Sequence, residues 1–511
     1  MIRHLTVLLA ASFLFCACST PTSTPARPST APESQRQEFL ERFARAYYPG
    51  RSGQIFLVPH EGDFITVREA NYAFTHGSPW PYDSNIPIFF YGPPFIRQGV
   101  FDSPVAQQDV APTLAALLGT SPPSTTTGHA QRQVLGATNA HPKVIALIVM
   151  DAMRADYFDR YAALMPTLSR LRRDGAWFPR ARVNYLPTVT SVGHATVGTG
   201  TDPRVHGQVA NNLFNAATGK PQQAYDKLDP RELMALTLAD LWNLETEGRA
   251  VIAGQGGAIR AAAGLVGHGS CIVGGKPVLV GSYASDGGWE TNPSCYRLPD
   301  SLKTSNAKTY WDAAGGTWMN HDITSPSKFR SSSLYQRFEG DALVGVIEHE
   351  ALGVDDTTDL LLVNLKGPDY TAHAYGPDSA EIRETLGELD RQMARVIAAL
   401  DKKAGPDQTV IAITADHGMA AEPSQGHQRV YWDQVVDALD QKFDPVEKKI
   451  VRYYEDPADQ EIYVDRERLR TLGFSLKDVT AFLETLPYIQ MAFTEDEVRA
   501  VSLPGGQGPA G

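Results

Sequence analysis

The sequence predicts an α/β protein with a mainly parallel central sheet, helices on both faces of that sheet, a smaller α/β subdomain and a loop-rich insertion. From Val144 onward, short apolar segments alternate with amphipathic ones, which is the order of parallel strands and crossover helices. Asp and His residues follow several apolar segments, where α/β proteins build their active sites. Residues 425–500 are more charged and predict the subdomain, whereas residues 270–335 are rich in Gly and polar residues and predict an insertion or cap.

The N-terminal part of the chain contains its own predicted elements. Residues 34–47 have the pattern of a helix, and the short, β-rich run 86–91 predicts a buried strand. A short helix follows, with Pro112 near its start and Gly119 just past its end. Residues 120–142 are rich in Ser, Thr, Pro and Gly and predict a linker.

Two helices are well marked in the second part of the chain. Residues 166–175 begin with Pro and end with Gly, as many helices do. Residues 379–403 carry apolar residues at three- and four-residue spacing, which gives a long helix one apolar face. These residues are Ile382, Leu386, Leu389, Met393, Ile397 and Leu400.

Length and composition limit the possible classes of protein. By length alone, 511 residues would fill about two to four domains. The chain is 42% hydrophobic and 20% charged, which is ordinary for a globular protein. Its net charge of -12 argues against nucleic acid as a partner, because a duplex binder needs a basic face.

The first residues have the features of a targeting segment. Arg3 precedes an apolar run about half as long as a membrane span. Cys18, preceded by Ala17, resembles a bacterial lipoprotein cleavage site, and Cys16 fits that pattern less well. The alternative is an ordinary signal peptide with incidental cysteines. Residues 19–35 are rich in Ser, Thr, Pro and Ala, which suits a tether.

Two cysteines remain after such processing, Cys271 and Cys295. An even pair in an exported protein predicts a disulfide. The alternative is two buried free thiols.

Six residues with metal-ligand side chains fall in three clusters and one further motif. Hard oxygen and imidazole ligands without thiolates suit zinc in an open, catalytic role. An Asp at a strand end can also cap the next helix, but an adjacent Asp-His pair and an Asp and His at i, i+4 are harder to explain in that way. The six residues are Asp151, Thr190, Asp369, His373, Asp416 and His417.

The motifs that contain these residues resemble the alkaline phosphatase superfamily. They are D-A-M-R-A-D-Y, N-Y-L-P-T-V-T-S-V-G-H-A-T-V-G-T-G, H-G-Q-V-A-N-N-L-F, P-D-Y-T-A-H and T-A-D-H-G-M. Within the superfamily they are most similar to the bacterial phosphate-insensitive alkaline phosphatases and the nucleotide pyrophosphatase/phosphodiesterases. The resemblance extends in pieces over residues 36–500.

The resemblance implies two Zn²⁺ ions and a threonine nucleophile. Thr190, rather than Thr188, is the expected nucleophile because His194 follows it at the fourth place, and a phosphothreonine intermediate would form on it. We expect His194 and His206 to have structural roles. One zinc would be bound by Asp151, Thr190, Asp416 and His417, and the other by Asp369, His373 and a further histidine.

The further histidine determines the expected architecture. The family carries it late in the chain, in a segment that resembles T-H-G-S-P-W-P-Y-D-S-N-I-P-I, but here that segment lies at the front and contains His76. We therefore expect His76 to be the seventh metal residue and the chain to be circularly permuted. The rival ligand is His427, ten residues after His417.

The permutation predicts how the chain divides. The expected parts are a lipoprotein-type signal peptide (1–18), a tether (19–35), the permuted C-terminal part of the catalytic domain (36–119), a linker (120–142), the main part of that domain (143–424), the small subdomain (425–500) and a tail (501–511).

The expected substrate-binding residues are Asn211, Arg260 and Lys366. The resemblance implies that Asn211 binds a phosphoryl oxygen. The phosphate-insensitive enzymes carry a Lys-x-Arg pair that clamps a monoester, and here Arg260 matches the arginine but Ala258 stands at the lysine position. Lys366 could compensate by entering the same pocket, or it could be a solvated loop charge.

The sequence thus predicts an exported, zinc-dependent phosphoester hydrolase that acts on a small phosphorylated substrate, with monoesters slightly favoured. A phosphodiesterase or nucleotide pyrophosphatase is the first alternative, and a non-catalytic zinc-binding surface lipoprotein is the second. Sulfatase is disfavoured because its nucleophile signature is absent, and a cytosolic phosphoglycerate mutase conflicts with the signal segment. The expected location is the bacterial periplasm, with a lipid anchor to the outer membrane through Cys18.

Overall fold

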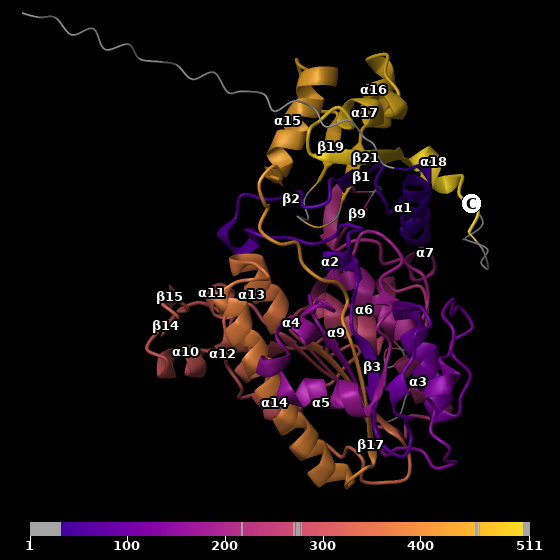
Figure 1. The fold of residues 1–511 in the computed structure, drawn as a ribbon, viewed down its shortest axis with the longest axis vertical. Helices are drawn as coiled ribbons and strands as arrows, with labels where there is room; N and C mark the ends of the chain where they lie inside the picture. Colours follow the sequence, from indigo (N-terminus) through magenta and orange to yellow (C-terminus); the bar gives the residue numbers. More distant parts are fainter. Residues whose placement is uncertain are drawn as a thin grey trace, which may run out of the picture.

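The computed structural model describes residues 32–503, except 216–217, 269–270, 272–275, 277, 455–457 and 459. The predicted signal peptide, most of the predicted tether and most of the predicted tail lie outside the described residues. A large mixed sheet forms the centre of the lower part of the molecule in Figure 1, and a smaller sheet lies in the upper part. The predicted α/β class is confirmed.

The large sheet has nine strands and is parallel through its centre. Its strands, in spatial order, are β13 (Trp289–Glu290), β12 (Leu279–Tyr283), β11 (Ile252–Gly256), β16 (Asp359–Leu365), β6 (Val144–Met150), β17 (Thr409–Thr414), β3 (Ile88–Tyr91), β7 (Ala176–Trp177) and β4 (Gly99–Val100). The five strands from β12 to β17 are mutually parallel, and β3 pairs antiparallel with β17. Every residue of β6, β16 and β17 is buried, as expected for apolar strands covered on both faces.

Two groups of helices cover the sheet (Figure 1). The first group is α5 (Pro166–Asp174), α12 (Ser333–His349), α13 (Gly367–Tyr375) and α14 (Ala380–Ala404). The second group is α3 (Val110–Leu118), α6 (Thr190–Thr199), α8 (Leu238–Glu245) and α9 (Ile259–Val266). The long helix α14 begins where Ser379 accepts a hydrogen bond from the backbone N–H of Ile382, and its predicted apolar face is buried.

The small sheet contains a strand from the N-terminal part of the chain. Its order is β19 (Val451–Tyr453), β20 (Glu461–Val464), β1 (Ile55–Pro59) and β21 (Ile489–Thr494), and all neighbours are antiparallel. Helices α15 (Trp432–Phe443), α16 (Arg466–Thr471) and α17 (Leu476–Leu483) pack on it and share a separate apolar core. The subdomain is therefore completed by residues far away in the sequence.

The N-terminal segment contributes to both parts of the molecule. Helix α1 (Glu33–Ala46) and strands β1 and β2 (Phe64–Thr66) lie with the small subdomain, whereas β3 and α3 belong to the main domain. After α3, residues 120–142 lead to β6, and their backbone bonds to the main domain, since Gly136 N donates to Phe95 O at 2.7 Å. The predicted domain boundaries stay a prediction.

The segment 270–335 contains more regular structure than its composition predicts. It supplies β12 and β13 at one edge of the large sheet, the hairpin β14 (Thr317–Trp318) and β15 (His321–Asp322), and the short helices α10 (Lys308–Ala313) and α11 (Pro326–Phe329). Strand β12 escapes a composition-based prediction because Gly281 interrupts its apolar run. A disulfide joins Cys271 to Cys295, as the even pair predicts. Within residues 32–503, apart from the gaps given above, no helix combines the length and apolar character of a membrane span.

Candidate active site

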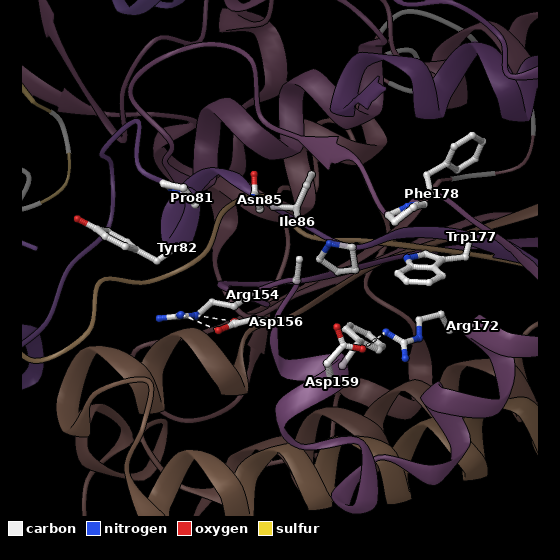
Figure 2. Close-up of a pocket in the computed structure, with 14 residues that line it drawn as sticks. Pro81, Tyr82, Asn85, Ile86, Arg154, Asp156, Asp159, Arg172, Trp177 and Phe178 are labelled. Atoms are coloured by element: carbon white, nitrogen blue, oxygen red, sulfur yellow. Dashed lines mark hydrogen bonds and ion pairs between the residues drawn. The ribbon is translucent and has the colours of Figure 1, made fainter. Parts of the chain in front are cut away.

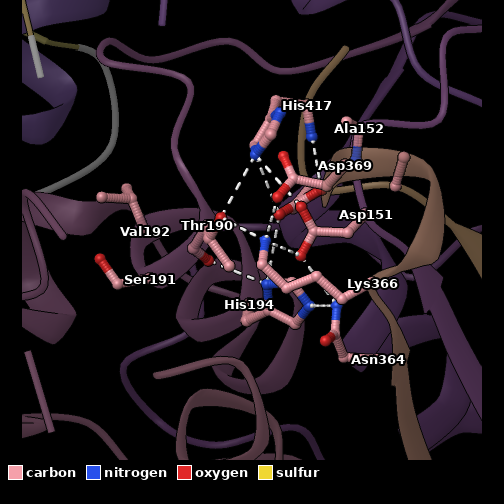
Figure 3. A network of polar contacts seen from close by, with 12 residues as sticks. Asp151, Ala152, Thr190, Ser191, Val192, His194, Asn364, Lys366, Asp369 and His417 are labelled. Atoms are coloured by element: carbon pink, nitrogen blue, oxygen red, sulfur yellow. Dashed lines mark hydrogen bonds and ion pairs between the residues drawn. The ribbon is translucent and has the colours of Figure 1, made fainter. Parts of the chain in front are cut away.

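Ligand-type side chains converge at the carboxyl ends of three neighbouring strands (Figure 3). Asp151 directly follows β6, and Asp416 and His417 follow β17. Asp369 and His373 lie on α13, one turn apart, just after β16. All five side chains are buried. The parallel register of the strands brings together residues that are separated by more than two hundred positions in the sequence.

Thr190 faces this cluster from the first position of α6. Its Oγ1 lies 3.4 Å from His417 Nε2, and Lys366 Nζ donates a hydrogen bond to it at 3.2 Å. The Thr188 hydroxyl instead donates to the carbonyl of Ser78 at 3.3 Å. Of the two threonines, the one expected to be the nucleophile is the one whose hydroxyl contacts the cluster.

The first set of ligand atoms surrounds His417 Nε2. This nitrogen lies 3.2 Å from Asp416 Oδ2 and 3.5 Å from Asp151 Oδ1, in addition to its contact with the Thr190 hydroxyl. The four residues assigned to one zinc by the resemblance are therefore adjacent in space.

The second set surrounds Asp369 Oδ1. His373 Nε2 lies 3.3 Å and His76 Nε2 lies 3.8 Å from this oxygen. The His76 ring also stacks on the ring of His417, with centroids 3.5 Å apart. His427 lies elsewhere: its Nδ1 is 3.3 Å from Asp63 Oδ1, and it belongs to none of the three Asp/His groups found among the described residues. The histidine that the structure places at the cluster is thus His76.

Each of the three histidines is oriented by a backbone carbonyl. Nδ1 of His76 donates to Thr188 O at 2.8 Å, Nδ1 of His373 to Phe74 O at 2.7 Å, and Nδ1 of His417 to Gly418 O at 2.9 Å. These bonds fix the tautomer and leave each Nε2 facing the carboxylates, which is the usual outer arrangement around a metal-binding imidazole.

The carboxylates also fit a cation site. Among the described residues, one oxygen of each carboxylate is buried without a hydrogen-bond donor: Asp151 Oδ1, Asp369 Oδ1 and Asp416 Oδ2. Buried carboxylate oxygens normally have a donor, a counter-ion or a metal. The donor set of carboxylate, imidazole and hydroxyl groups therefore fits divalent metal ions.

Lys366 lies between the two sets. Its Nζ is 2.8 Å from Asp151 Oδ2 and 2.7 Å from Asp369 Oδ2, and the side chain is fully buried. Burial alone would lower the pKa of Lys366, but these two carboxylates raise it above its usual value, so the side chain is an ammonium ion. A Cβ atom on Gly257 would lie 2.5 Å from Lys366 Cβ, which shows that the glycine makes room for this lysine. Of the two interpretations of Lys366, the solvated loop charge is excluded by its burial.

His194 and Asn364 support the nucleophile and Asp151. Nδ1 of His194 donates to the carbonyl of Thr190 at 2.9 Å, and its Nε2 accepts from Asn364 Nδ2 at 2.9 Å. Asn364 Nδ2 also donates to Asp151 Oδ2 at 2.9 Å. Burial lowers the pKa of His194 to about 4, which keeps the ring neutral. Asn364 is absent from the expected residues because an Asn inside an apolar strand carries no motif.

The expected substrate-binding residues lie in two places. Asn211 Oδ1 accepts from the backbone N–H of Ser191 at 3.0 Å, so its side chain is held beside the start of α6. Arg260, in the first turn of α9, lines a cavity of about 330 Å³ together with Ala258 and Tyr370. Tyr370 connects that cavity to the cluster, because Lys366 Nζ lies 5.2 Å from the centroid of its ring.

Comparisons with known proteins agree with this geometry. Residues 145–481 match the family described as type I phosphodiesterase / nucleotide pyrophosphatase. Alkaline phosphatase PafA from Elizabethkingia meningoseptica is 26% identical over an alignment of 442 residues, and the match covers 73% of this chain and 79% of that protein. Alkaline phosphatase PhoK from Sphingomonas sp is 26% identical over an alignment of 424 residues, and the match covers 71% of this chain and 73% of that protein.

The fold is also similar to that of a solved relative. The crystal structure of wild-type alkaline phosphatase PafA superposes with a TM-score of 0.57 at 23% identity, covering 68% of this chain and 76% of that one. Since the family match covers well over half of the 511 residues, the chain belongs to the type I phosphodiesterase/nucleotide pyrophosphatase family, within the alkaline phosphatase superfamily.

Proposed function

We propose that this protein is a zinc-dependent phosphoester hydrolase that transfers the phosphoryl group of a small phosphomonoester to Thr190 and then to water. The observation that carries the proposal is the position of the Thr190 hydroxyl. It lies within hydrogen-bond distance of Lys366 Nζ and of His417 Nε2, at the point where the Asp/His groups meet.

The residues that would hold the metals follow from the two sets of ligand atoms. Asp151, Thr190, Asp416 and His417 would hold one Zn²⁺, and Asp369, His373 and His76 the other. Two bound zinc ions would lower the pKa of the nucleophilic hydroxyl and stabilise negative charge on the attacking and leaving oxygens.

The protein's own groups have distinct tasks in the two displacements. The Thr190 hydroxyl loses its proton and its Oγ1 forms a bond to phosphorus while the bond to the leaving oxygen breaks, and the leaving oxygen takes a proton from water and departs as the alcohol. Water then attacks the phosphothreonine, which releases phosphate and restores the hydroxyl. The Asn211 amide, which is held by the Ser191 N–H at the start of α6, orients a phosphoryl oxygen, and the Lys366 ammonium offsets the charge of the phosphoryl group.

The experiment that tests this proposal compares two esters before and after metal removal. We expect kcat/KM for p-nitrophenyl phosphate to exceed that for bis-p-nitrophenyl phosphate. Dialysis against a chelator should abolish turnover, and added zinc should restore it with two ions per chain. Zinc-loaded protein that turns over neither ester would instead favour a binding protein.

A phosphodiesterase or nucleotide pyrophosphatase is the second candidate, and two observations favour it. The family match is to that class, and Ala258 stands where the resemblance places a lysine of the monoester clamp. A diester carries one negative charge fewer at phosphorus, so it needs less positive charge in the site. A hundredfold preference for the diester in the same assay would establish this candidate in place of the first.

We also propose the circular permutation and the export of the protein. The family match begins at Ile145, yet His76, β3 and α3 from the preceding segment lie in the main domain, which supports the view that residues 36–119 complete the catalytic domain. For export, metabolic labelling with radioactive palmitate should mark the protein at the outer membrane, and Cys18→Ala should abolish the label.

A further inference from the structure

A cavity that shares the Tyr370 ring with the active-site cluster contains an arginine that no motif identifies. The cavity of about 330 Å³ is lined by Gly257, Arg260, Tyr283, Glu290, Arg330 and Tyr370, among others. Arg330 comes from the end of α11, inside the segment 270–335 whose role the sequence does not reveal. The cavity therefore combines a residue expected from the resemblance, Arg260, with one that the insertion supplies.

Tyr370 connects this cavity to the cluster at Thr190. The Tyr370 hydroxyl donates to Gly257 O at 2.9 Å, which fixes the ring. Arg330 Cζ lies 4.6 Å and Lys366 Nζ lies 5.2 Å from the centroid of that ring. Since Lys366 Nζ also contacts the Thr190 hydroxyl, Arg330 is one aromatic ring away from the cation at the nucleophile.

Arg330 contacts the Tyr370 ring but has no counter-ion among the described residues. Among the described residues its guanidinium takes part in no ion pair, and its Nε is buried without a hydrogen-bond partner. Among the residues that the structure describes, the cavity is lined by one acidic residue, Glu290, and by two arginines. A half-buried guanidinium without a counter-ion, in a cavity with excess positive charge, indicates an anionic ligand.

A second cavity provides a contrast. It measures about 340 Å³ and is lined by Arg154 and Arg172, but each arginine is paired inside the cavity (Figure 2). Arg154 Nη2 lies 2.8 Å from Asp156 Oδ2, and Arg172 Nη1 lies 3.0 Å from Asp159 Oδ1. The two cavities, of about 340 and 330 Å³, thus differ in whether their arginines are paired, because Arg330 in the cavity that shares Tyr370 with the cluster has no ion-pair partner among the described residues.

We infer that Arg330 is a substrate-binding residue that replaces the lysine missing at Ala258, and that with Arg260 it binds the non-bridging oxygens of a phosphomonoester dianion. Ala258 and Arg330 line the same cavity, so the insertion supplies a cation to the cavity in which the position of the missing lysine lies. This inference rests on the proposed function and deepens it, because it assigns the monoester preference to a residue of the insertion. Two arginines can bind two or three phosphoryl oxygens at once, and the dianion gains more from this than a diester does.

The test compares Arg330→Ala, Arg330→Lys and a control, Lys328→Ala. Lys328 lies on the same short helix, is exposed and is paired with Asp322. Lys328→Ala should therefore leave kcat/KM for both esters unchanged. We expect Arg330→Ala to lower kcat/KM for p-nitrophenyl phosphate by about 30–100-fold and that for bis-p-nitrophenyl phosphate by less than about threefold. Arg330→Lys keeps the positive charge but loses the bidentate guanidinium, so its kcat/KM for p-nitrophenyl phosphate should lie between those of the wild type and of Arg330→Ala. The inhibition constant of inorganic phosphate should be lowest for the wild type, higher for Arg330→Lys and highest for Arg330→Ala.

Calorimetric titration with inorganic phosphate separates this inference from the proposed function. If the wild type turns over neither ester, the proposed function fails, but weaker phosphate binding by Arg330→Ala would still support the anion site. The inference about Arg330 is wrong if the wild type is active and Arg330→Ala lowers kcat/KM equally for both esters. It is also wrong if Arg330→Ala leaves phosphate binding unchanged. Thermal melting of each variant shows whether a loss comes from unfolding.

Discussion

Lys366 Nζ lies 3.2 Å from Thr190 Oγ1 and simultaneously contacts one carboxylate from each of the two sets of ligand atoms. A buried ammonium in this place has two consequences. It neutralises part of the negative charge that three buried aspartates bring to the site, and it places a fixed cation beside the hydroxyl that we propose as the nucleophile.

Substitution of Lys366 by Met should therefore lower both the activity of the enzyme and the stability of the metal-free protein. The variant keeps the length of the side chain but loses the charge. We expect kcat/KM for a phosphomonoester to fall by about a hundredfold. The chelator-treated variant should lose about 3–5 kcal/mol of unfolding free energy, because buried carboxylates lose their partner. Urea unfolding with and without zinc measures this, and the loss should shrink when zinc pairs with the same carboxylates.

A matched control separates this effect from a general loss of positive charge. Lys402 is exposed, and its Nζ lies 3.5 Å from Glu348 Oε1. Lys402→Met should therefore leave both kcat/KM and the unfolding free energy unchanged. A Lys366→Met enzyme with wild-type kcat/KM would refute the role of the ammonium at the nucleophile.

Replacement of Thr190 by Ala should abolish turnover, whereas replacement of Thr188 should not. We expect Thr190→Ala to lose at least about a thousandfold in kcat while it retains its zinc-binding carboxylates. Thr188→Ala loses only a hydroxyl bond to Ser78 O and should stay within about threefold of wild type. Intact mass measured after an acid quench should show one added phosphoryl group on the wild type and none on Thr190→Ala. A phosphorylated Thr190→Ala protein would place the nucleophile elsewhere.

The sequence predicts the parts of this site that local pattern encodes. Strands β6, β16 and β17 are unbroken apolar runs, and a ligand-type residue follows each of them, so both the strands and the cluster can be predicted. The pairing of β1 with β20 and β21 cannot be predicted in this way, because a five-residue apolar strand is compatible with either sheet.

The interior charges are the part that local pattern does not encode. Lys366 follows an apolar strand, and nothing within a few residues distinguishes a buried lysine from a solvated one. Its burial depends on Asp151, which is more than two hundred positions away, and on the absence of a side chain at Gly257. Arg330 is equally invisible, since it lies in a segment whose composition predicts loops and its partner ring belongs to α13.

His76→Ala and His427→Ala should differ in zinc content. His76 Nε2 points toward Asp369 Oδ1, so its loss should remove one of the two ions and most of the activity. His427 pairs with Asp63 away from the cluster, and His427→Ala should keep two ions and near-wild-type turnover. Atomic emission analysis of the dialysed protein gives the number of zinc ions per chain directly. The reverse result would remove the support that His76 lends to the circular permutation.

Glu461 should make the small subdomain less stable as the pH rises. Burial raises the pKa of Glu461 to about 8, although Gly53 N donates to its Oε2 at 2.6 Å. The unfolded chain loses this proton near pH 4.5, so between these values the folded state binds more protons and stability falls by up to about 1.4 kcal/mol per pH unit. Glu461→Gln removes this contribution while its amide oxygen can still accept the bond from Gly53. Its unfolding free energy relative to wild type should therefore rise steadily from about pH 5 to about pH 8, as measured by urea titration at each pH. A difference for Glu461→Gln that stays flat over this pH range would mean that this carboxyl is ionised in the folded protein.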